Sequence, residues 1–428
     1  MRIIAGLFFV ASALLLQGAQ FRAAAVKVNI TPKTQQWLMG YNDRQSTGVH
    51  DDLNHRILAI DDGSTQFYLI ASDLCLFSPS VYLGVTEQLR REFGINPENV
   101  WWTVTHTHAA PEVGPPEVYK MLLAGRGNHE WNRDYAKQVT DSLIQGIKTV
   151  RQNLEPARIR IGSGISMANI NRRAQDVDGH VTLGLNPDGP VDRQLGVLLV
   201  ERLNGSPIAA VANYAMHGTV LGGENLLISG DAPGVVSTYV EEKIGVPMLY
   251  FNGAAGNMAP IYSVYPDPQS GHLSQFRVLL GNRILQALEN LERPTDHVTL
   301  RVGEKIIETR RKDGLIWPEE LRAYSRVSDN GVPLVRLPIG FLQINDTLIW
   351  SAPVELFCEI AIAVRNQSAF AHTFYFGYAN GWLGYLPTKA AFEEGGYEPK
   401  TSPFTGSAEK DVLNGVISYV QGASRSAN

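Results

Sequence analysis

Two histidines, His106 and His108, stand at the end of an apolar run, residues 100–105, that reads VWWTVT. Its β-branched and aromatic residues predict a strand, and Pro111 and Gly114 break the run afterwards. Alternation along an extended chain would place both imidazoles on the same face. Such a pair beside a loop rich in Gly and Pro could hold a metal ion or move a proton, although two partly buried polar histidines would give the same pattern.

Three more polar side chains stand where predicted elements begin or end, far from the first pair in sequence. His217 follows a predicted strand over residues 208–216, and Tyr385 follows one over residues 373–378. Glu355 stands just inside the start of a helix that we expect to run to about residue 366. Histidine, histidine and carboxylate with an open position make a common catalytic zinc set. Taken singly, each has a simpler interpretation: a strand-end hydrogen bond, a helix-start cap and a core aromatic residue.

The elements that must position these side chains alternate between strands and helices. Further strands are predicted at residues 24–30, 56–60, 66–71, 157–165, 195–202, 246–252, 298–309, 335–344 and 347–351. Further helices are predicted at residues 81–93, 133–154, 234–244, 273–291 and 409–419. This interleaving predicts an α/β fold, a single large domain with mixed β-sheets flanked by helices. The loop over residues 109–131 is long enough to form a lid or a pocket wall.

Composition describes an ordinary globular protein with an N-terminal export signal. Of 428 residues, 44% are hydrophobic and 18% charged, and the net charge is −5 with no basic run, which argues against a nucleic-acid partner. Residues 1–19 combine Arg2, an apolar run and small residues. This predicts a signal peptide, a secreted or periplasmic protein and a domain over residues 20–428, with an uncleaved anchor as the alternative. Cys75 and Cys358 lie in apolar runs and are expected to be buried thiols, or at most one bridge.

A family resemblance rests on seven motifs and their order: THTHAAP, ANINR, NYAMHG, SGDAPG, GAAGNMAP, PVE and NGWLGYLPT. Together they resemble the catalytic N-terminal domain of the neutral or alkaline non-lysosomal ceramidases, which are secreted or membrane-facing zinc amidases. The resemblance covers nearly all of residues 20–428 and implies a neutral-ceramidase-like fold. Carried over motif by motif, it implies that Zn²⁺ is held by His106, His217, Glu355 and Tyr385.

The same motifs imply three catalytic side chains: His108, Arg172 and Tyr385. His108 would face the substrate as proton donor or oxyanion partner. Arg172 of ANINR would bind substrate or, with Tyr385, stabilise developing charge. Arg173 is the alternative to Arg172, because either side chain could point inward. Asp231 of SGDAPG would either support a ligand or cap a helix N-terminus.

One motif departs from the family pattern. The family turn reads glycine, aspartate, any residue, serine and proline, and its serine is assigned as nucleophile or substrate anchor. Here Asn257 stands in place of the aspartate and Ala259 in place of the serine. Because alanine can neither attack nor donate a hydrogen bond, we expect attack by zinc-activated water without an acyl-enzyme.

These observations predict a secreted zinc-dependent hydrolase of an ester bond or of an amide bond, the latter in a ceramide-like N-acyl group. Its partner would be a small-molecule or lipid acyl substrate, and any contact with a membrane surface would be peripheral. Three alternatives stay open: a zinc-binding, non-catalytic ceramidase-like protein, an esterase acting on acylated carbohydrate, and a periplasmic α/β protein without a metal. The sequence leaves the oligomeric state open.

Overall fold

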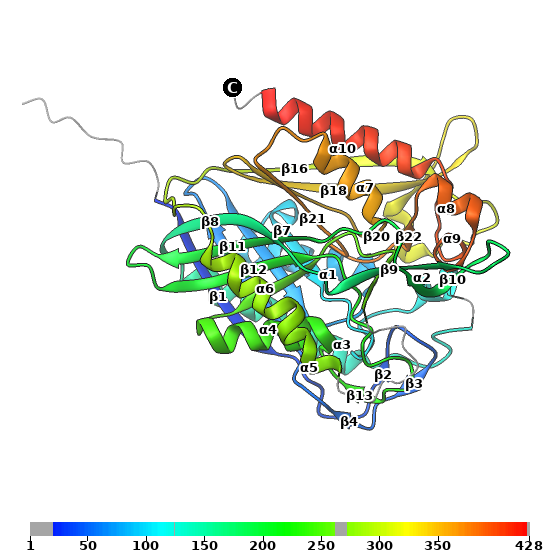
Figure 1. Cartoon of the computed structure of the whole chain (residues 1–428), viewed down its shortest axis with the longest axis horizontal. Helices are drawn as coiled ribbons and strands as arrows, with labels where there is room; N and C mark the ends of the chain where they lie inside the picture. The colour runs from blue at the N-terminus through cyan, green and yellow to red at the C-terminus, as the bar shows by residue number, and fades with distance from the viewer. Residues whose placement is uncertain (1–19, 124, 262–271, 426–428) are drawn as a thin grey trace, which may run out of the picture.

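Two β-sheets lie face to face between outer layers of helices in the computed structural model of the chain (Figure 1). The structure describes residues 20–123, 125–261 and 272–425. The predicted signal peptide, residues 1–19, lies outside the described residues. The mixed sheets with flanking helices confirm the predicted α/β class.

The larger sheet has eight strands in the order β14-β12-β11-β8-β1-β5-β6-β7. In chain order these are β1 (Arg22–Asn29), β5 (Asn54–Asp61), β6 (Gln66–Ser72), β7 (Val100–Val104), β8 (Glu155–Ile165), β11 (Gln194–Arg202), β12 (Pro207–Tyr214) and β14 (Met248–Asn252). Neighbours are antiparallel except in the pairs β6–β7 and β12–β14. Parallel neighbours need a crossover, which α1 (Pro79–Phe93) and α4 (Asp231–Ile244) provide.

The smaller sheet has the order β16-β18-β19-β21, with a short edge strand beside β18. Its strands are β16 (Leu300–Arg310), β17 (Ser325–Val327), β18 (Pro333–Ile344), β19 (Thr347–Ser351) and β21 (His372–Phe376). Apolar side chains from both sheets join in one buried cluster, to which Phe67 and Trp101 contribute from the larger sheet and Leu342 and Phe374 from the smaller. This shared cluster holds the two sheets together as one core.

Helices cover the outer face of each sheet (Figure 1). α3 (Arg133–Gln152), α4 and α6 (Asn282–Glu289) pack on the larger sheet, and α7 (Cys358–Asn366) and α10 (Ala408–Arg425) lie over the smaller one. α3 buries one apolar face and begins where the Asn132 side chain accepts a hydrogen bond from the Tyr135 amide at 3.0 Å. Among the described residues, no helix is long and apolar enough to cross a membrane.

Two local predictions were wrong, and one small sheet was not predicted. Glu355 does not start a helix: it lies in the two-residue strand β20 (Glu355–Leu356), which pairs with β22 (Tyr385–Leu386), and α7 begins only at Cys358. The helix expected over residues 273–291 is divided into α5 (His272–Phe276), a π-helical stretch at Arg277–Gly281 and α6. A three-stranded sheet of β9 (Asn169–Gln175), β10 (Val181–Asn186) and β15 (Met258–Pro260) was not predicted.

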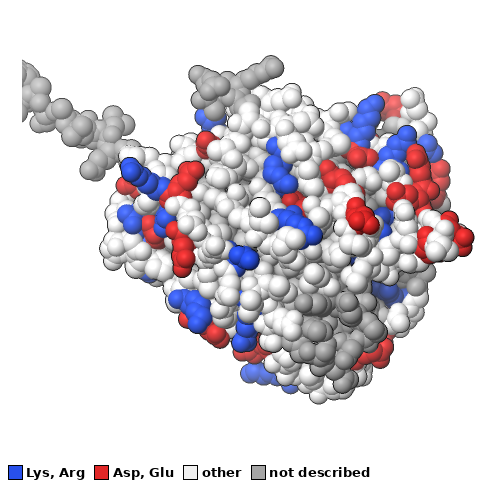
Figure 2. Space-filling view, viewed as in Figure 1, with Lys and Arg blue, Asp and Glu red and all other residues white. Residues whose placement is uncertain are grey.

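Smaller elements complete the edge that carries the site. β2 (Trp37–Leu38) pairs with β3 (Arg44–Gln45), and β4 (Gly48–Val49) pairs with β13 (Leu227–Ile228). The remaining short helices there are α2 (Glu117–Leu122), α8 (Lys389–Glu394) and α9 (Tyr397–Lys400). On the face drawn in Figure 2, acidic and basic side chains are interspersed, in keeping with the small net charge of −5.

Candidate metal centre

His106 and His108 meet because of a left-handed turn, not because of strand alternation. β7 ends at Val104, and His106 has a φ of 61°. The expected extended geometry is therefore wrong, yet the two rings are neighbours, with centroids 4.7 Å apart and Nε2 atoms 3.1 Å apart. Gly40 lies against the His108 ring. A Cβ at that glycine would be 2.5 Å from the ring Cγ, so no larger residue fits there.

The segment that carries His217 runs directly against the His106 segment. The His108 amide donates to the Gly218 carbonyl at 2.8 Å, and the Gly218 amide donates to the His106 carbonyl at 3.2 Å. A Cβ on Gly218 would lie 2.8 Å from that carbonyl oxygen, so glycine permits the close approach of the two chains. The rings of His106 and His217 consequently lie with their centroids 4.6 Å apart.

Glu355 enters the site from the short strand β20. Its parallel register places Glu355 beside Tyr385 of β22, so two predicted site residues 30 positions apart lie side by side. Trp382 donates its indole N–H to Glu355 Oε1 at 2.9 Å, and the Tyr378 hydroxyl lies 3.4 Å from Oε2. The contacts with Trp382 and Tyr378 thus orient the carboxylate so that Oε2 faces the histidines.

The donor atoms of His106, His217 and Glu355 converge. Glu355 Oε2 lies 3.4 Å from His106 Nε2 and 3.1 Å from His217 Nε2, and all three side chains are buried. Each histidine donates through Nδ1 to a backbone carbonyl: His106 to Cys75 at 2.9 Å and His217 to Met258 at 3.0 Å. Those bonds turn Nε2 of each ring toward Glu355, which is how metal-ligating histidines are oriented.

The three residues therefore fit a metal ion, since their ligand atoms all lie within 4.8 Å of one another. Two other groups of metal-binding side chains occur among the described residues. One joins Cys75 and His108 to His106 itself, and the other, Asp176, Asp178 and His180, is fully exposed on the β9–β10 hairpin. The buried His/His/carboxylate group is the one that matches a zinc donor set.

The surroundings of the site shift the pKa values of three of its side chains, Glu355, His217 and His108. Burial opposes ionisation of Glu355, but its interactions with His106 and His217 outweigh it and hold the pKa of this carboxyl well below its usual range. Burial, reinforced by Arg172 and His106, lowers the pKa of His217 to about 3. Burial together with His106 and His217 also lowers the pKa of His108 well below its usual value. At neutral pH the carboxylate is thus charged, and His108 and His217 are neutral.

Arg172 and Arg173 are adjacent in β9, and the structure places Arg172 at the centre. Arg172 Nη1 lies 3.0 Å from His217 Nε2, and Nη2 donates to the Tyr385 hydroxyl at 3.1 Å. Arg173 instead pairs with the buried Glu398 at 2.8 Å and with the exposed Glu394 at 3.0 Å. The sequence left Arg172 and Arg173 open as candidates, and Arg172 is the one that lies beside the donor group.

Two other residues singled out in the sequence lie outside the donor group. Asp231 begins α4 with a φ of 52°, and its carboxylate accepts hydrogen bonds from the amides of Val220, Leu221 and Ala232. It therefore organises the preceding loop and is not the N-cap of the helix, which is Gly230. Ala259 lies buried in β15, opposite Ile170 of β9.

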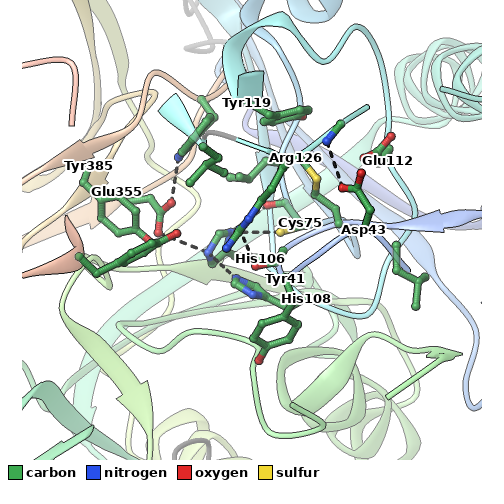
Figure 3. Close-up of a pocket in the computed structure, with 18 residues that line it drawn as sticks. Tyr41, Asp43, Cys75, His106, His108, Glu112, Tyr119, Arg126, Glu355 and Tyr385 are labelled. Atoms are coloured by element: carbon green, nitrogen blue, oxygen red, sulfur yellow. Dashed lines mark hydrogen bonds and ion pairs between the residues drawn. The ribbon is translucent and has the colours of Figure 1, made fainter. Parts of the chain in front are cut away.

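A pocket opens onto the donor group (Figure 3). The loop over residues 109–131 supplies part of its wall, including Glu112, Tyr119 and Arg126, as predicted for a pocket wall. Tyr41, Trp382 and Tyr397 are among the aromatic side chains that line it, with His106, His108, Glu355 and Tyr385 at one end and Asp43 and Glu112 at the other. A mostly apolar and aromatic cleft with a few polar groups is typical of a small-molecule site.

Sequence reasoning missed the residues that support the site. These are Trp382 and Tyr378 behind Glu355, and Glu398 behind Arg172. Trp382 stands three residues before Tyr385 in the same motif, which was a usable signal. No local pattern marks Glu398, because its partner in β9 is 226 residues away.

The fold and the site together define a class of protein: a two-sheet α/β protein with a buried His/His/Glu group able to hold a metal ion at the strand ends. A family model for the N-terminal region of the neutral/alkaline non-lysosomal ceramidases matches residues 22–254, more than half of the chain. The chain belongs to this family, as its motifs indicated.

Individual relatives show how far the chain has diverged. Neutral ceramidase B of Dictyostelium discoideum is 28% identical over 251 residues, which are 55% of this chain and 33% of the relative. The neutral ceramidase of Pseudomonas aeruginosa is 26% identical over 263 residues, 58% of this chain and 38% of the relative. The match therefore spans little more than a third of the length of these curated relatives.

Solved structures show the same fold over nearly the whole chain. The crystal structure of neutral ceramidase from Pseudomonas aeruginosa has a TM-score of 0.76 at 19% identity, covering 94% of this chain and 75% of that chain. A structure of ceramidase complexed with C2 has a TM-score of 0.77 at 18% identity, covering 95% and 76%. The fold thus extends beyond the region that the family model matches.

Proposed function

We propose that this chain is a zinc-dependent acyl hydrolase that cleaves an amide or ester bond, and that a ceramide-like N-acyl lipid is the first substrate to test. Membership of the ceramidase family supports hydrolysis of an N-acyl bond. The observation that carries the proposal is the buried convergence of His106, His217 and Glu355, with both histidines oriented by backbone carbonyls. Tyr385, beside Glu355, is the proposed fourth ligand.

Zinc held by these residues would polarise the acyl carbonyl and lower the pKa of a water molecule. The chain's own groups supply the rest. Neutral His108, whose Nε2 lies 3.1 Å from His106 Nε2, accepts a proton at the reacting centre and returns it to the leaving group. Arg172, fixed between His217 and Tyr385, stabilises negative charge that develops on the acyl oxygen.

Metal content and turnover test this function together. Purified protein is expected to hold zinc in stoichiometric amount and to hydrolyse at least one member of a panel of N-acyl amines, acyl esters and acylated sugars. Removal of the zinc with a chelator should abolish turnover, and added zinc should restore it. A zinc-loaded protein that is inert on the whole panel would instead be a binding protein, and a protein without zinc would contradict the proposal.

Replacing His108 by alanine separates proton transfer from metal binding. Because His108 is proposed to move a proton and not to hold the ion, His108→Ala should retain zinc and lose about 10²-fold in kcat. Elemental analysis and steady-state kinetics measure the two effects. Loss of the metal in this variant would show that His108 is a ligand and would contradict its assigned role.

The Ala259→Ser variant tests whether a side-chain nucleophile is needed. If attack needs no serine, no burst of first product should precede the steady state in the wild type, and the added hydroxyl should bring little gain. Crowding in buried β15 could cost about 1 kcal/mol or more of unfolding free energy. An inert wild type together with a serine variant that cleaves ceramide would indicate a degenerate ceramidase instead.

Secretion is proposed from the composition of residues 1–19 alone. N-terminal sequencing of exported protein should then find a mature chain that begins between about residues 20 and 26. Detection of Met1 on the exported protein would favour an uncleaved anchor.

A further inference from the structure

Glu398 is a fully buried carboxylate that lies next to the site but outside the donor group. It belongs to the short helix α9, and its side chain is 1% exposed. Its two oxygens bind two different arginines: Oε1 accepts from Arg172 Nε at 2.9 Å and Oε2 accepts from Arg173 Nη1 at 2.8 Å. One carboxylate thus holds both of the adjacent arginines of β9.

The contact with Arg172 determines how its guanidinium is presented. A guanidinium is planar, with its donors in a fixed fork, so fixing Nε also fixes the directions of the two terminal nitrogens. With Nε bound to Glu398, Nη1 reaches His217 and Nη2 reaches the Tyr385 hydroxyl. A rotated Arg172 could not keep both of these contacts.

The segment that bears Glu398 is itself anchored. Lys312 donates from Nζ to the carbonyls of Pro399 at 2.5 Å and Ser402 at 2.9 Å, immediately after the carboxylate. Tyr397, the residue before Glu398, lines the pocket and packs edge to face on Tyr385, with ring centroids 5.6 Å apart. α9 therefore connects one pocket wall to the orientation of Arg172.

We propose that Glu398 is a positioning residue for the reaction, which acts through Arg172 by holding its guanidinium beside His217 and against the Tyr385 hydroxyl. The proposal rests on the proposed hydrolase function. It assigns a role to a residue that touches neither the donor group nor the pocket, and it gives Arg173 a structural role as the second anchor of the same carboxylate.

Glu398→Gln is the test, because the amide keeps the shape of the side chain but turns one acceptor into a donor that faces an arginine. We expect kcat to fall roughly 10- to 100-fold through misplacement of Arg172, with KM changed less than about threefold and zinc content unchanged. Glu394→Gln is the matched control. Glu394 pairs with Arg173 at 3.0 Å, but its side chain is 42% exposed and it makes no contact with Arg172. The kcat of Glu394→Gln should stay within about twofold of the wild type.

A double-mutant cycle distinguishes positioning from general support of the fold. If Glu398 acts through Arg172, the kcat of Glu398→Gln/Arg172→Lys should equal that of Arg172→Lys alone. Additive losses would overturn the proposal, as would a lowered melting temperature with unchanged kcat. Glu398→Asp, which keeps the charge, should recover part of the lost kcat and serves as the readout if the glutamine variant fails to fold. A wild type without chelator-sensitive turnover would refute the proposed function itself, a result distinct from either of these outcomes.

Discussion

Replacement of Glu355 by glutamine is expected to remove zinc and nearly all turnover. The amide keeps the volume of the side chain and can still accept the indole hydrogen bond of Trp382, at 2.9 Å in the wild type. It removes the negative charge that lies 3.1 and 3.4 Å from the Nε2 atoms of His217 and His106. A metal cation bound by the two imidazoles would then have no protein carboxylate ligand. We expect zinc to fall below stoichiometric content and kcat/KM to fall by about 10³-fold or more.

A neighbouring acid supplies the control for this experiment. Glu359 lies in the first turn of α7, four residues after Glu355, and its carboxylate accepts a hydrogen bond from the Asn257 side chain at 2.8 Å. Glu359→Gln keeps an acceptor at this position and is expected to leave zinc content unchanged. If Glu355→Gln keeps its zinc and its activity, His106, His217 and Glu355 do not form the metal centre, and the proposed function is wrong.

The family motifs indicated the donor set as a whole, and strand ends indicated two of its members, His106 and His217. His106 follows a mostly apolar strand, and His217 follows another. Such runs predict buried strands well, and their ends project polar side chains beyond the sheet. What could not be predicted is how the ends meet. The left-handed turn at His106 and the close contact at Gly218 depend on two chain segments that pack against each other, which no single window of sequence displays.

The strands that carry Glu355 and Arg172 show why local sequence patterns did not predict other parts of the site. β20 has two residues and exists only because β22, 30 positions later, pairs with it, so its sequence carries no strand periodicity. β9 places Arg172 and Arg173 in a buried strand, which polarity alone argues against. The compensating charge comes from Glu398, a distant partner that offsets part of the cost of burying the two arginines.

The stacking of the two sheets was the part of the fold that sequence reasoning left open. Alternation indicates that a strand buries one face, and a continuous apolar run such as residues 248–251 of β14 indicates that both faces are buried. Neither pattern says which surface covers the second face. In the structure, Phe67 and Trp101 of the larger sheet pack against the inner face of the smaller one, while α3 covers the other side. The α/β class was therefore predictable, but the layer order was not.

Replacement of Arg172 by lysine is expected to cost about 10²- to 10³-fold in kcat while the protein keeps its zinc. Lysine preserves the positive charge but replaces a planar fork by a single ammonium, which cannot contact His217, Tyr385 and Glu398 together as the guanidinium does at 3.0, 3.1 and 2.9 Å. If Arg172 acts by presenting N–H donors to developing negative charge, lysine should not restore kcat, because it keeps the positive charge but lacks the planar guanidinium. KM should change far less than kcat, because the interaction is made mainly in the transition state.

Arg173→Lys is the matched control for this variant, since it makes the same chemical change one residue away in the same strand. Arg173 contacts Glu398 and Glu394 but makes no contact with His217 or Tyr385. Its replacement should lower the melting temperature and reduce kcat by less than about fivefold, because the guanidinium of Arg172 keeps its own oxygen of Glu398. Equal losses of kcat in the two variants would mean that the arginine pair supports the fold as a unit. Stabilisation of the acyl oxygen would then have to be assigned to the metal and Tyr385 without Arg172.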